Sequence, residues 1–285
     1  MNALGVVTIN FWGTEPPLER RLALAERQLA ALAPDVVCMQ EVRPLDGRAG
    51  RTTADVLGDA LGMARVYEVS LRWDDSDFYV GHPGGEEGLA ILSRHPIVER
   101  RVTRLPEARK TEARILLSVQ IDTPAGLVWV HTTHLHYRLD DGVAREHQVV
   151  AIDDIVRGIQ SESEGANARP QILCGDFNAP PDADEIRFMR GLTTLSGRRT
   201  HYQDAWLRCH SGTPGLTWSS ENEQTRPLRS LDIDRRIDYV FVTTRRKDGR
   251  GTVLDCKVAL DEREEMICAS DHFGVWARVQ ITAGQ

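Results

Sequence analysis

Short apolar runs that end in polar residues recur along the whole chain. A run of four to seven residues rich in Val, Ile and Leu, followed by a turn residue, is typical of a buried strand. The run Val6–Trp12 ends at Gly13, and the run Val36–Met39 leads directly into Gln40 and Glu41. The predicted strands cover residues 6–12, 36–39, 66–71, 89–92, 115–121, 127–133, 172–174, 237–243, 252–258 and 275–281.

Apolar residues at helical spacing separate several of these strands. Leu18, Leu22, Ala25, Leu29 and Leu32 form one stripe of a helix that ends before a proline. A second stripe predicts a longer helix after the strand 127–133, formed by Val149, Ile152, Val156 and Ile159. Shorter helices are predicted over residues 54–61 and 184–192. Long irregular segments are expected at residues 43–53, 74–87, 161–170 and 198–229, where Gly, Pro, Arg and polar residues gather.

This order of elements predicts an α/β protein of the α+β type. Strand pairs alternate irregularly with helices, unlike the regular alternation of a doubly wound sheet, so we expect two sheets packed face to face with helices outside. No internal repeat and no strong boundary divides the chain. We therefore expect a single domain over residues 1–285.

Charge narrows the range of partners. The 285 residues carry a formal net charge of −7, which disfavours non-specific nucleic-acid binding through lysine and arginine. Two basic runs, at residues 100–114 and 245–250, stand out against this background and are interpreted as solvated faces. No obligate protein partner is evident from the sequence.

Cysteine usage and the first residues favour a cytoplasmic protein. The five cysteines are an odd number without a CxxC pair, which is typical of a reducing compartment. The segment Met1–Gly5 leads into a strand without a charged and apolar leader, and no apolar stretch reaches the length of a membrane span.

Carboxylate, amide and imidazole side chains close or follow the apolar runs. A strand has no structural need for such groups at its end, and any single one is typical of a turn or of a buried histidine. Their repetition in one chain predicts a catalytic site. The residues are Asn10, Glu41, His134, Asp176, Asn178, Asp238, Asp271 and His272.

These residue types suit a divalent cation and a phosphate ester. Glu41 and Asn10 offer the hard oxygen ligands that Mg²⁺ prefers, whereas too few Cys and His residues lie at zinc-ligand spacing. Asp176 and Asn178 are two apart on an extended segment and can face the same way. His134 and His272 can donate to phosphate oxygens or move protons, and Asp238 could orient His272.

The motifs and their order resemble the endonuclease/exonuclease/phosphatase superfamily, which includes deoxyribonuclease I, abasic-site endonucleases, sphingomyelinases and inositol-polyphosphate phosphatases. The matching segments span nearly the whole chain. They are Thr8–Gly13, Met39–Val42, Gly88–Arg94, Thr133–Leu135, Gly175–Asn178, Arg236–Val240 and Ser270–His272. The resemblance implies a four-layer α/β/β/α sandwich, with two packed mixed sheets flanked by helices and the site at one end.

The resemblance also implies roles for individual residues. Glu41, helped by Asn10 and supported by Asp271, would hold Mg²⁺, for which Mn²⁺ is a possible substitute. Asp176 would orient or deprotonate the attacking water, and Asn178 would touch the phosphate.

The remaining roles concern the two histidines and their supports. His272, paired with Asp238, would be the other candidate base, and His134 would donate to a non-bridging phosphate oxygen. Glu112 would brace His134. Arg145 is either a supporting residue or part of a helix surface.

The expected reaction is in-line attack of an activated water on a phosphodiester, assisted by a divalent metal. Two alternatives remain. A phosphomonoesterase acting on a small metabolite or lipid headgroup would need extra cations, which Arg43, Lys110 or Arg114 could supply. A non-catalytic phosphate-binding protein could use the same scaffold.

The substrate stays open between nucleic acid, a lipid headgroup and a small phosphoester. Aromatic residues in two loops could stack on a base, pack a lipid or simply fill the loop. They are Trp73, Phe78, Tyr79, His82 and Trp218.

Overall fold

Two six-stranded mixed sheets form the centre of the protein. The computed structural model describes residues 2–45, 50–73, 85–107, 112–162, 168–225 and 232–284. In the first sheet the strand order is β11-β12-β1-β2-β4-β3. Its strands are β1 (Ala3–Asn10), β2 (Val36–Val42), β3 (Ala64–Arg72), β4 (Glu86–Ser93), β11 (Val253–Ala259) and β12 (Gly274–Gln280).

The second sheet has the order β5-β6-β7-β8-β10-β9. Its strands are β5 (Ile97–Arg104), β6 (Ile115–Thr123), β7 (Gly126–His134), β8 (Ile172–Asp176), β9 (Tyr202–Asp204) and β10 (Asp238–Thr243). The pairs β1–β2 and β7–β8 are parallel, whereas the other neighbours are antiparallel.

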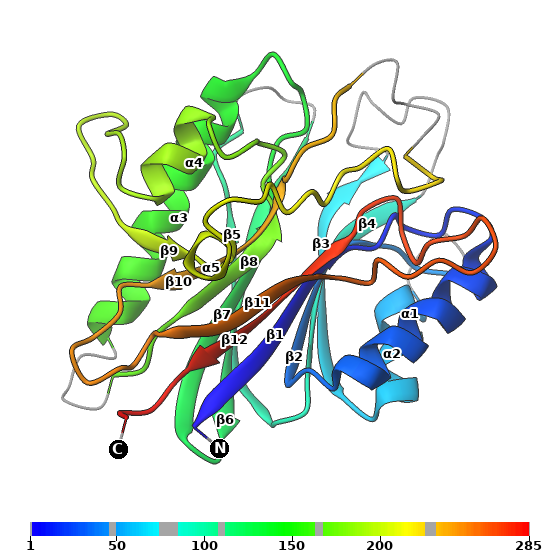
Figure 1. Cartoon of the computed structure of the whole chain (residues 1–285), viewed down its shortest axis with the longest axis horizontal. Helices are drawn as coiled ribbons and strands as arrows, with labels where there is room; N and C mark the ends of the chain where they lie inside the picture. Colours follow the sequence, from blue (N-terminus) through cyan, green and yellow to red (C-terminus); the bar gives the residue numbers. More distant parts are fainter. Residues whose placement is uncertain are drawn as a thin grey trace.

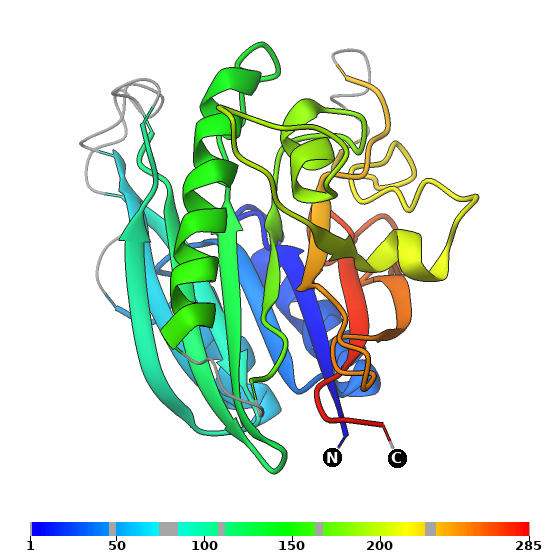
Figure 2. The same cartoon turned by 90° about the vertical axis from the view of Figure 1, so that its left-hand side faces the viewer.

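Helices cover the outer face of each sheet, which confirms the predicted sandwich. The helices α1 (Leu18–Leu32) and α2 (Thr53–Leu61) lie on the first sheet, and α3 (Gly142–Glu162) runs along the second (Figure 1, Figure 2). The short helix α4 (Asp184–Met189) packs beside α3, and α5 (Ala205–Cys209) lies against β11.

Three apolar cores hold the layers together because the central strands are buried on both faces. Alternate residues of β1 point to opposite sides, so Leu4 and Val6 lie between the sheets while Val7 and Ile9 face α1 and α2. In the same way, Ile172 of β8 joins the central core. Its neighbour Leu173 joins the core under α3 and α4.

Strand register brings the carboxyl ends of β7 and β8 beside the start of β10. His134 is opposite Asp176 in the parallel pair, and Asp238 is opposite Asp176 in the antiparallel pair. Gly175 makes this approach possible, because its φ is +150° and a Cβ there would lie 2.1 Å from the carbonyl oxygen of Thr133. Asp176 therefore follows a glycine for steric reasons.

Most predicted elements are confirmed, with three omissions. Strand β5 was interpreted as part of a solvated basic run, since its three arginines mask an edge strand whose residues are alternately exposed and half-buried. Strand β9 and helix α5 lie inside a segment predicted to be irregular, because each is only three to five residues long. The predicted loop 74–87 overlaps β4, which begins at Glu86; Phe78, Tyr79 and His82 lie outside the described residues.

The five cysteines are free, and all except Cys209 are buried. Cys38 and Cys174 lie in the core between the sheets, as expected for small apolar side chains. No helix in the described part of the chain combines the length and apolar character needed to cross a membrane.

His131 in β7 gives the fold a specific sensitivity to acid. Its Nε2 donates to Oε1 of Gln171 at 2.8 Å, and its Nδ1 lies 2.7 Å from Oγ of Ser118, so the ring is satisfied when neutral. Burial lowers the pKa of His131 to about 4. The unfolded chain takes up this proton near pH 6.5, so the stability contributed by neutral His131 is complete above that pH and is lost as the pH falls toward 4.

We expect His131 to lower the free energy of unfolding by about 2 kcal/mol between pH 7 and pH 5. Urea unfolding of the wild type and of His131→Gln at both pH values measures this contribution. The variant should lose correspondingly less stability on acidification. An equal loss in both proteins would show that another group is responsible.

Candidate active site

The polar strand ends predicted from the sequence meet at one end of the sandwich. The chain termini lie at the other end, where β1 begins and β12 finishes (Figure 1). Asn10, His134 and Asp176 close β1, β7 and β8, and Asp238 opens β10. Side chains distant in sequence therefore share one site because parallel neighbours end at the same edge.

Asp176 occupies the centre of this group. Its Oδ2 accepts from Nδ2 of Asn10 at 3.1 Å and lies 3.5 Å from Nε2 of His134 and 3.9 Å from Nε2 of His272. Its Oδ1 accepts from the backbone N–H of Asn178 at 2.8 Å. Burial, reinforced by the negative charge of Asp238, raises the pKa of Asp176 to about 7. The carboxylate is thus fixed in orientation and able to exchange a proton near neutral pH.

Asp238 and His272 form a buried hydrogen-bonded pair, as the sequence predicted. Nδ1 of His272 donates to Oδ2 of Asp238 at 2.9 Å, which leaves Nε2 directed toward Asp176. Burial opposes the charged ring, but the carboxylates of Asp238, Asp176 and Asp271 outweigh it and raise the pKa of His272 to about 10. The imidazole is therefore a cation and a hydrogen-bond donor at neutral pH.

Trp218 and Thr217 hold this pair from the adjoining loop. The Trp218 ring meets the His272 ring edge-on, with centroids 5.0 Å apart. Oγ1 of Thr217 accepts from the backbone N–H groups of Ile237 and Asp238 at 3.1 and 3.2 Å. Trp218 therefore lies within the site. From the sequence, Trp218 was one of several loop aromatics whose role was undecided.

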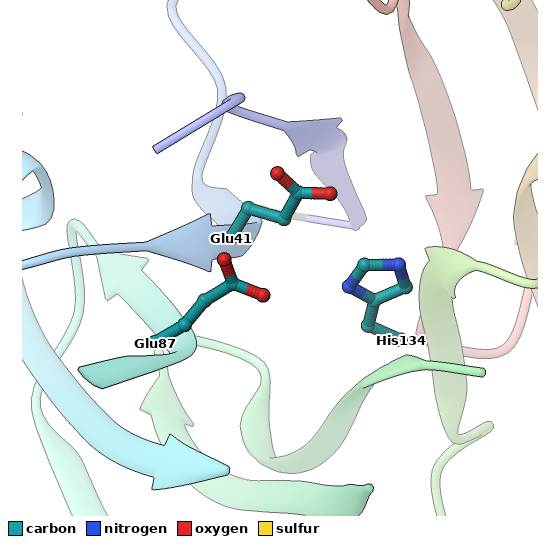
Figure 3. Close-up of side chains that lie close together, drawn as sticks. All are labelled: Glu41, Glu87 and His134. Carbon is teal, nitrogen blue, oxygen red and sulfur yellow. The ribbon is translucent and has the colours of Figure 1, made fainter. Parts of the chain in front are cut away.

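A cluster of acids lies beside Asp176. Oε1 of Glu41 accepts from Nδ2 of Asn10 at 2.9 Å. Ligand atoms of Glu41, Glu87 and His134 all lie within 4.8 Å of one another, and Figure 3 shows the two carboxylates close together with the imidazole facing them. Asp271 adds a further carboxylate that interacts electrostatically with Glu41.

The donors of this cluster fit a divalent cation. Burial and the nearby charge of Glu41 raise the pKa of Glu87 to about 7 and that of Asp271 to about 6. Carboxylates that repel one another in this way are stabilised by a cation between them. Carboxylate oxygens are ligands for Mg²⁺ or Mn²⁺ rather than for zinc, and Asn10 orients Glu41 by donating to it from Nδ2. Glu41, Asn10 and Asp271 were predicted to serve the metal, whereas Glu87 was assigned to a loop.

Glu87 could have been found from its position at the start of a buried apolar run. It lies directly before Gly88, where a Cβ would lie 2.0 Å from the carbonyl oxygen of Glu68, so the strand pairing is unusually close. Nε of Arg43 donates to Glu87 at 2.9 Å, and Nη1 of Arg43 donates to Glu15 at 3.1 Å. Arg43 therefore links two acids at the rim of the site.

Arg21 is a second buried arginine. It lies on the buried face of α1 among the apolar residues that predicted the helix, so the sequence did not indicate a role for it. Its guanidinium donates to the carbonyl oxygens of Ala269 at 3.1 Å and Glu15 at 2.6 Å, and also to that of Phe11. It thereby ties the segment after β1 to the segment that carries Asp271. Burial lowers the pKa of Arg21 to about 10, so the side chain is still a cation at neutral pH.

His134 is held in its neutral form. Burial, with the positive charges of Arg114 and His272 nearby, lowers its pKa well below the usual value of 6.5. A neutral imidazole can donate one hydrogen bond without adding charge. The position is consistent with the predicted contact to a phosphate oxygen.

The prediction that Glu112 braces His134 is wrong, because Glu112 contacts His136 instead. Oε2 of Glu112 accepts from Nδ1 of His136 at 2.7 Å, and Oε1 pairs with Arg114. His134 and His136 point to the same face of an extended segment, so spacing alone could not distinguish them. Glu112 thus supports the site indirectly, through Arg114.

Arg145 is a buried supporting residue and not part of a helix surface. Its Nε pairs with the carboxylate of Glu185, and its Nη1 donates to the carbonyl oxygens of His136 and Arg138. Oε1 of Gln148 accepts from the backbone N–H of His136 at 3.0 Å. Helix α3 and helix α4 therefore hold the segment that follows His134.

Asn178 has a conformation that places its side chain over the same segment. Its φ is +50°, a region that asparagine tolerates better than most residues. Nδ2 donates to the carbonyl oxygen of Leu135 at 3.0 Å. The amide therefore lies beside Asp176 and His134, as expected for a residue near the phosphate.

We expect Glu112→Gln to lower the free energy of unfolding by about 3 kcal/mol, because it leaves the buried cation of Arg114 without its carboxylate. Asp140→Asn is the matched control, since its pair with Arg138 is exposed to solvent and should contribute little to stability. Chemical unfolding of both variants measures the difference. Wild-type stability together with a 100-fold fall in kcat would instead place Glu112 in the chemistry.

Comparison with known proteins supports the same assignment. Residues 7–272 match the Endonuclease/Exonuclease/phosphatase family. Sphingomyelin phosphodiesterase 5 of Mus musculus is 31% identical over 154 residues, which cover 50% of this chain and 31% of that protein. A putative neutral sphingomyelinase of Drosophila melanogaster is 25% identical over 295 residues, covering 98% of this chain and 61% of that protein. The chain thus spans less than two thirds of either relative.

Solved structures show the same fold. An endonuclease/exonuclease/phosphatase from Beutenbergia cavernae DSM 12333 superposes with a TM-score of 0.71 at 26% identity, covering 99% of this chain and 72% of that one. TDP2 from C. elegans superposes with a TM-score of 0.71 at 18% identity, covering 98% of this chain and 75% of that one. At that identity the likeness to TDP2 concerns the fold alone.

The resemblance drawn from the motifs is confirmed by the match over residues 7–272, by the sandwich fold and by the convergence of the motif residues. Members of the Endonuclease/Exonuclease/phosphatase family and the sphingomyelin phosphodiesterase relative are hydrolases of phosphoesters. The chain belongs to the endonuclease/exonuclease/phosphatase family.

Proposed function

We propose that this protein hydrolyses a phosphodiester with the help of a divalent cation, Mg²⁺ first and Mn²⁺ as a substitute. The observation that carries the proposal is the arrangement around Asp176. A buried carboxylate near its titration point lies between a cationic imidazole, His272, and a neutral one, His134. A cluster of cation-binding oxygens adjoins it.

The charge of each side chain determines the role that we propose for it. Asp176 is placed to orient a water and to accept its proton, since Asn10 and the backbone of Asn178 fix both of its oxygens. His272, held by Asp238, is placed to donate to an oxygen that gains negative charge. A divalent cation held by Glu41, helped by Asn10 and supported by Asp271, would supply further stabilisation of that charge.

The surroundings favour a diester over a monoester. A monoester dianion needs additional cations, and Arg43, Lys110 and Arg114 were the candidates. Arg43 is engaged by Glu87 and Glu15, and Arg114 is buried against Glu112. Lys110 lies outside the described residues. The single charge of a diester matches the remaining donors better.

A lipid headgroup is the substrate class best supported for this site. The two curated relatives carry the names of enzymes acting on sphingomyelin, which contains a phosphodiester. The net charge of −7 also opposes binding of long nucleic acids. We therefore favour, as substrate, a phosphodiester that joins an apolar alcohol to a small headgroup over DNA or RNA.

Release of phosphocholine from sphingomyelin in detergent micelles, compared with cleavage of a single-stranded oligonucleotide, tests this choice. Both reactions are run with Mg²⁺ and with EDTA. Cleavage of the lipid alone, abolished by EDTA, is the expected result. Cleavage of the oligonucleotide alone would replace the lipid with nucleic acid and keep the diesterase assignment. Cleavage of neither would refute the lipid proposal.

A further inference from the structure

A cavity of about 670 Å³ opens at the end of the second sheet that is remote from the catalytic residues. Its lining residues come from the end of α3, the segment before β8, the loop leading into β9 and the end of β10, elements that Figure 1 labels or connects. Thr243 on its wall is five residues along β10 from Asp238, which corresponds to about 17 Å at the usual rise of a strand. The cavity is thus distinct from the site around Asp176.

The lining of this cavity is strongly basic although the chain as a whole is acidic. Its six arginines are Arg157, Arg169, Arg199, Arg245, Arg246 and Arg250. Asp153 is the one carboxylate among the lining residues, and it already accepts from Arg157, from Oγ1 of Thr200 and from the hydroxyl of Tyr202. The remaining positive charge faces the cavity without compensation from the lining.

Three of the arginines are fixed by the fold. Nε of Arg157 donates to Asp153 at 2.9 Å, and its Nη2 donates to the carbonyl oxygen of Arg199 at 2.9 Å. Arg250 pairs with Asp248 and donates from Nη1 to the carbonyl oxygen of Ala168 at 2.9 Å. Arg169 donates to the carbonyl oxygen of Ala125. These bonds hold three cations in place before any ligand arrives.

The other three arginines have donors to spare. Arg199, Arg245 and Arg246 donate no side-chain hydrogen bond within the ranges that the structure describes, and Arg246 interacts only electrostatically with Asp248. Like charges gathered in this way repel one another, and a guanidinium offers a planar fork that matches phosphate oxygens. The sequence run 245–250 was interpreted as a solvated face; Arg245 is exposed as expected, whereas Arg246 is half-buried and Arg250 is buried at the cavity.

We propose that this cavity binds a soluble compound with two or more clustered phosphate groups. The volume lies within the range of about 300–1,000 Å³ that is usual for small-molecule sites. Val156, Pro170 and the ring of Tyr202 provide an apolar part of the lining for the body of such a ligand. A nucleoside polyphosphate, an inorganic polyphosphate and a free inositol polyphosphate share the required chemistry.

Isothermal titration of the whole chain with inorganic tripolyphosphate, ATP and inositol 1,4,5-trisphosphate tests the proposal. The buffer contains EDTA and no metal, so that the phosphates are not recruited by a cation in the catalytic site. We expect saturable binding of at least one compound and weaker binding as NaCl is raised. The compound that binds most tightly identifies the source of the phosphates.

The variant Arg199→Ala/Arg245→Ala/Arg246→Ala should bind the same compound at least about 30-fold more weakly, since three partly exposed ion pairs of roughly threefold each multiply to that factor. Arg20→Ala/Arg27→Ala/Arg104→Ala removes the same charge from exposed sites elsewhere and should bind as the wild type does. Melting temperatures check that both variants are folded.

Equal weakening in both triple variants would overturn the proposal, because it would reduce the effect to overall charge. Absence of binding to the wild type at millimolar concentration of all three compounds would also overturn it. Saturable binding of a 20-nucleotide single strand in place of the small compounds, lost in the Arg199, Arg245 and Arg246 variant, would assign the cavity to nucleic acid instead.

Discussion

Asp176→Asn is expected to lower kcat for diester hydrolysis by about 10³- to 10⁴-fold while KM changes little. The amide keeps the shape of the carboxylate and can still contact Asn178, but it cannot accept a proton from water. The side chain acts on the reaction more than on substrate binding, so the loss falls on kcat. Steady-state kinetics on a synthetic diester measures both constants.

The stability of Asp176→Asn provides the control for this experiment. Because burial and Asp238 raise the pKa of Asp176 to about 7, its ionised form is unfavourable in the folded protein above that pH. Removing the charge should therefore leave the melting temperature at pH 8 unchanged or higher. A folded variant with activity within tenfold of the wild type would remove Asp176 from the catalytic role.

Glu41→Gln is expected to weaken activation by Mg²⁺ at least about 100-fold and to abolish most activity at physiological metal concentration. Glu41 lies where its carboxylate interacts with both Glu87 and Asp271, so it is the acid that the other two share. Its removal also relieves their repulsion. The metal-free variant should thus be at least as stable as the metal-free wild type, yet gain less stability when Mg²⁺ is added.

Glu15→Gln is the matched control for Glu41→Gln. Glu15 pairs with the same Arg43 from outside the acid cluster, so the neighbouring cation is disturbed in both variants. Activity measured across a Mg²⁺ titration should show an unchanged midpoint for Glu15→Gln. Similar midpoints for both variants would mean that Glu41 is not a metal ligand.

Residue patterns predicted the architecture well where strands are buried on both faces. The strands β1, β2 and β8 read as apolar runs because one face meets the other sheet and the other face meets a helix. An edge strand such as β5 carries three arginines, is exposed at alternate positions and shows no such run. Patterning therefore found the centre of each sheet more readily than its edges.

Order along the chain was enough to identify the residues that converge, but not every contact among them. The Asp238–His272 pair was predicted because a histidine needs a group to orient it. The partner of Glu112 was mistaken, since His134 and His136 have the same strand parity and only the tertiary structure shows which is in reach. Glu87 was missed because it matters through its closeness to Glu41, which lies 46 positions earlier in the chain.

The most direct test of the account is the rate at which the wild-type protein hydrolyses bis-p-nitrophenyl phosphate and p-nitrophenyl phosphate, each with Mg²⁺ and with EDTA. We predict cleavage of the diester that requires Mg²⁺, exceeds cleavage of the monoester and disappears in Asp176→Asn. Faster cleavage of the monoester, or diester cleavage that persists in EDTA or in Asp176→Asn, would contradict the proposed metal-dependent phosphodiesterase.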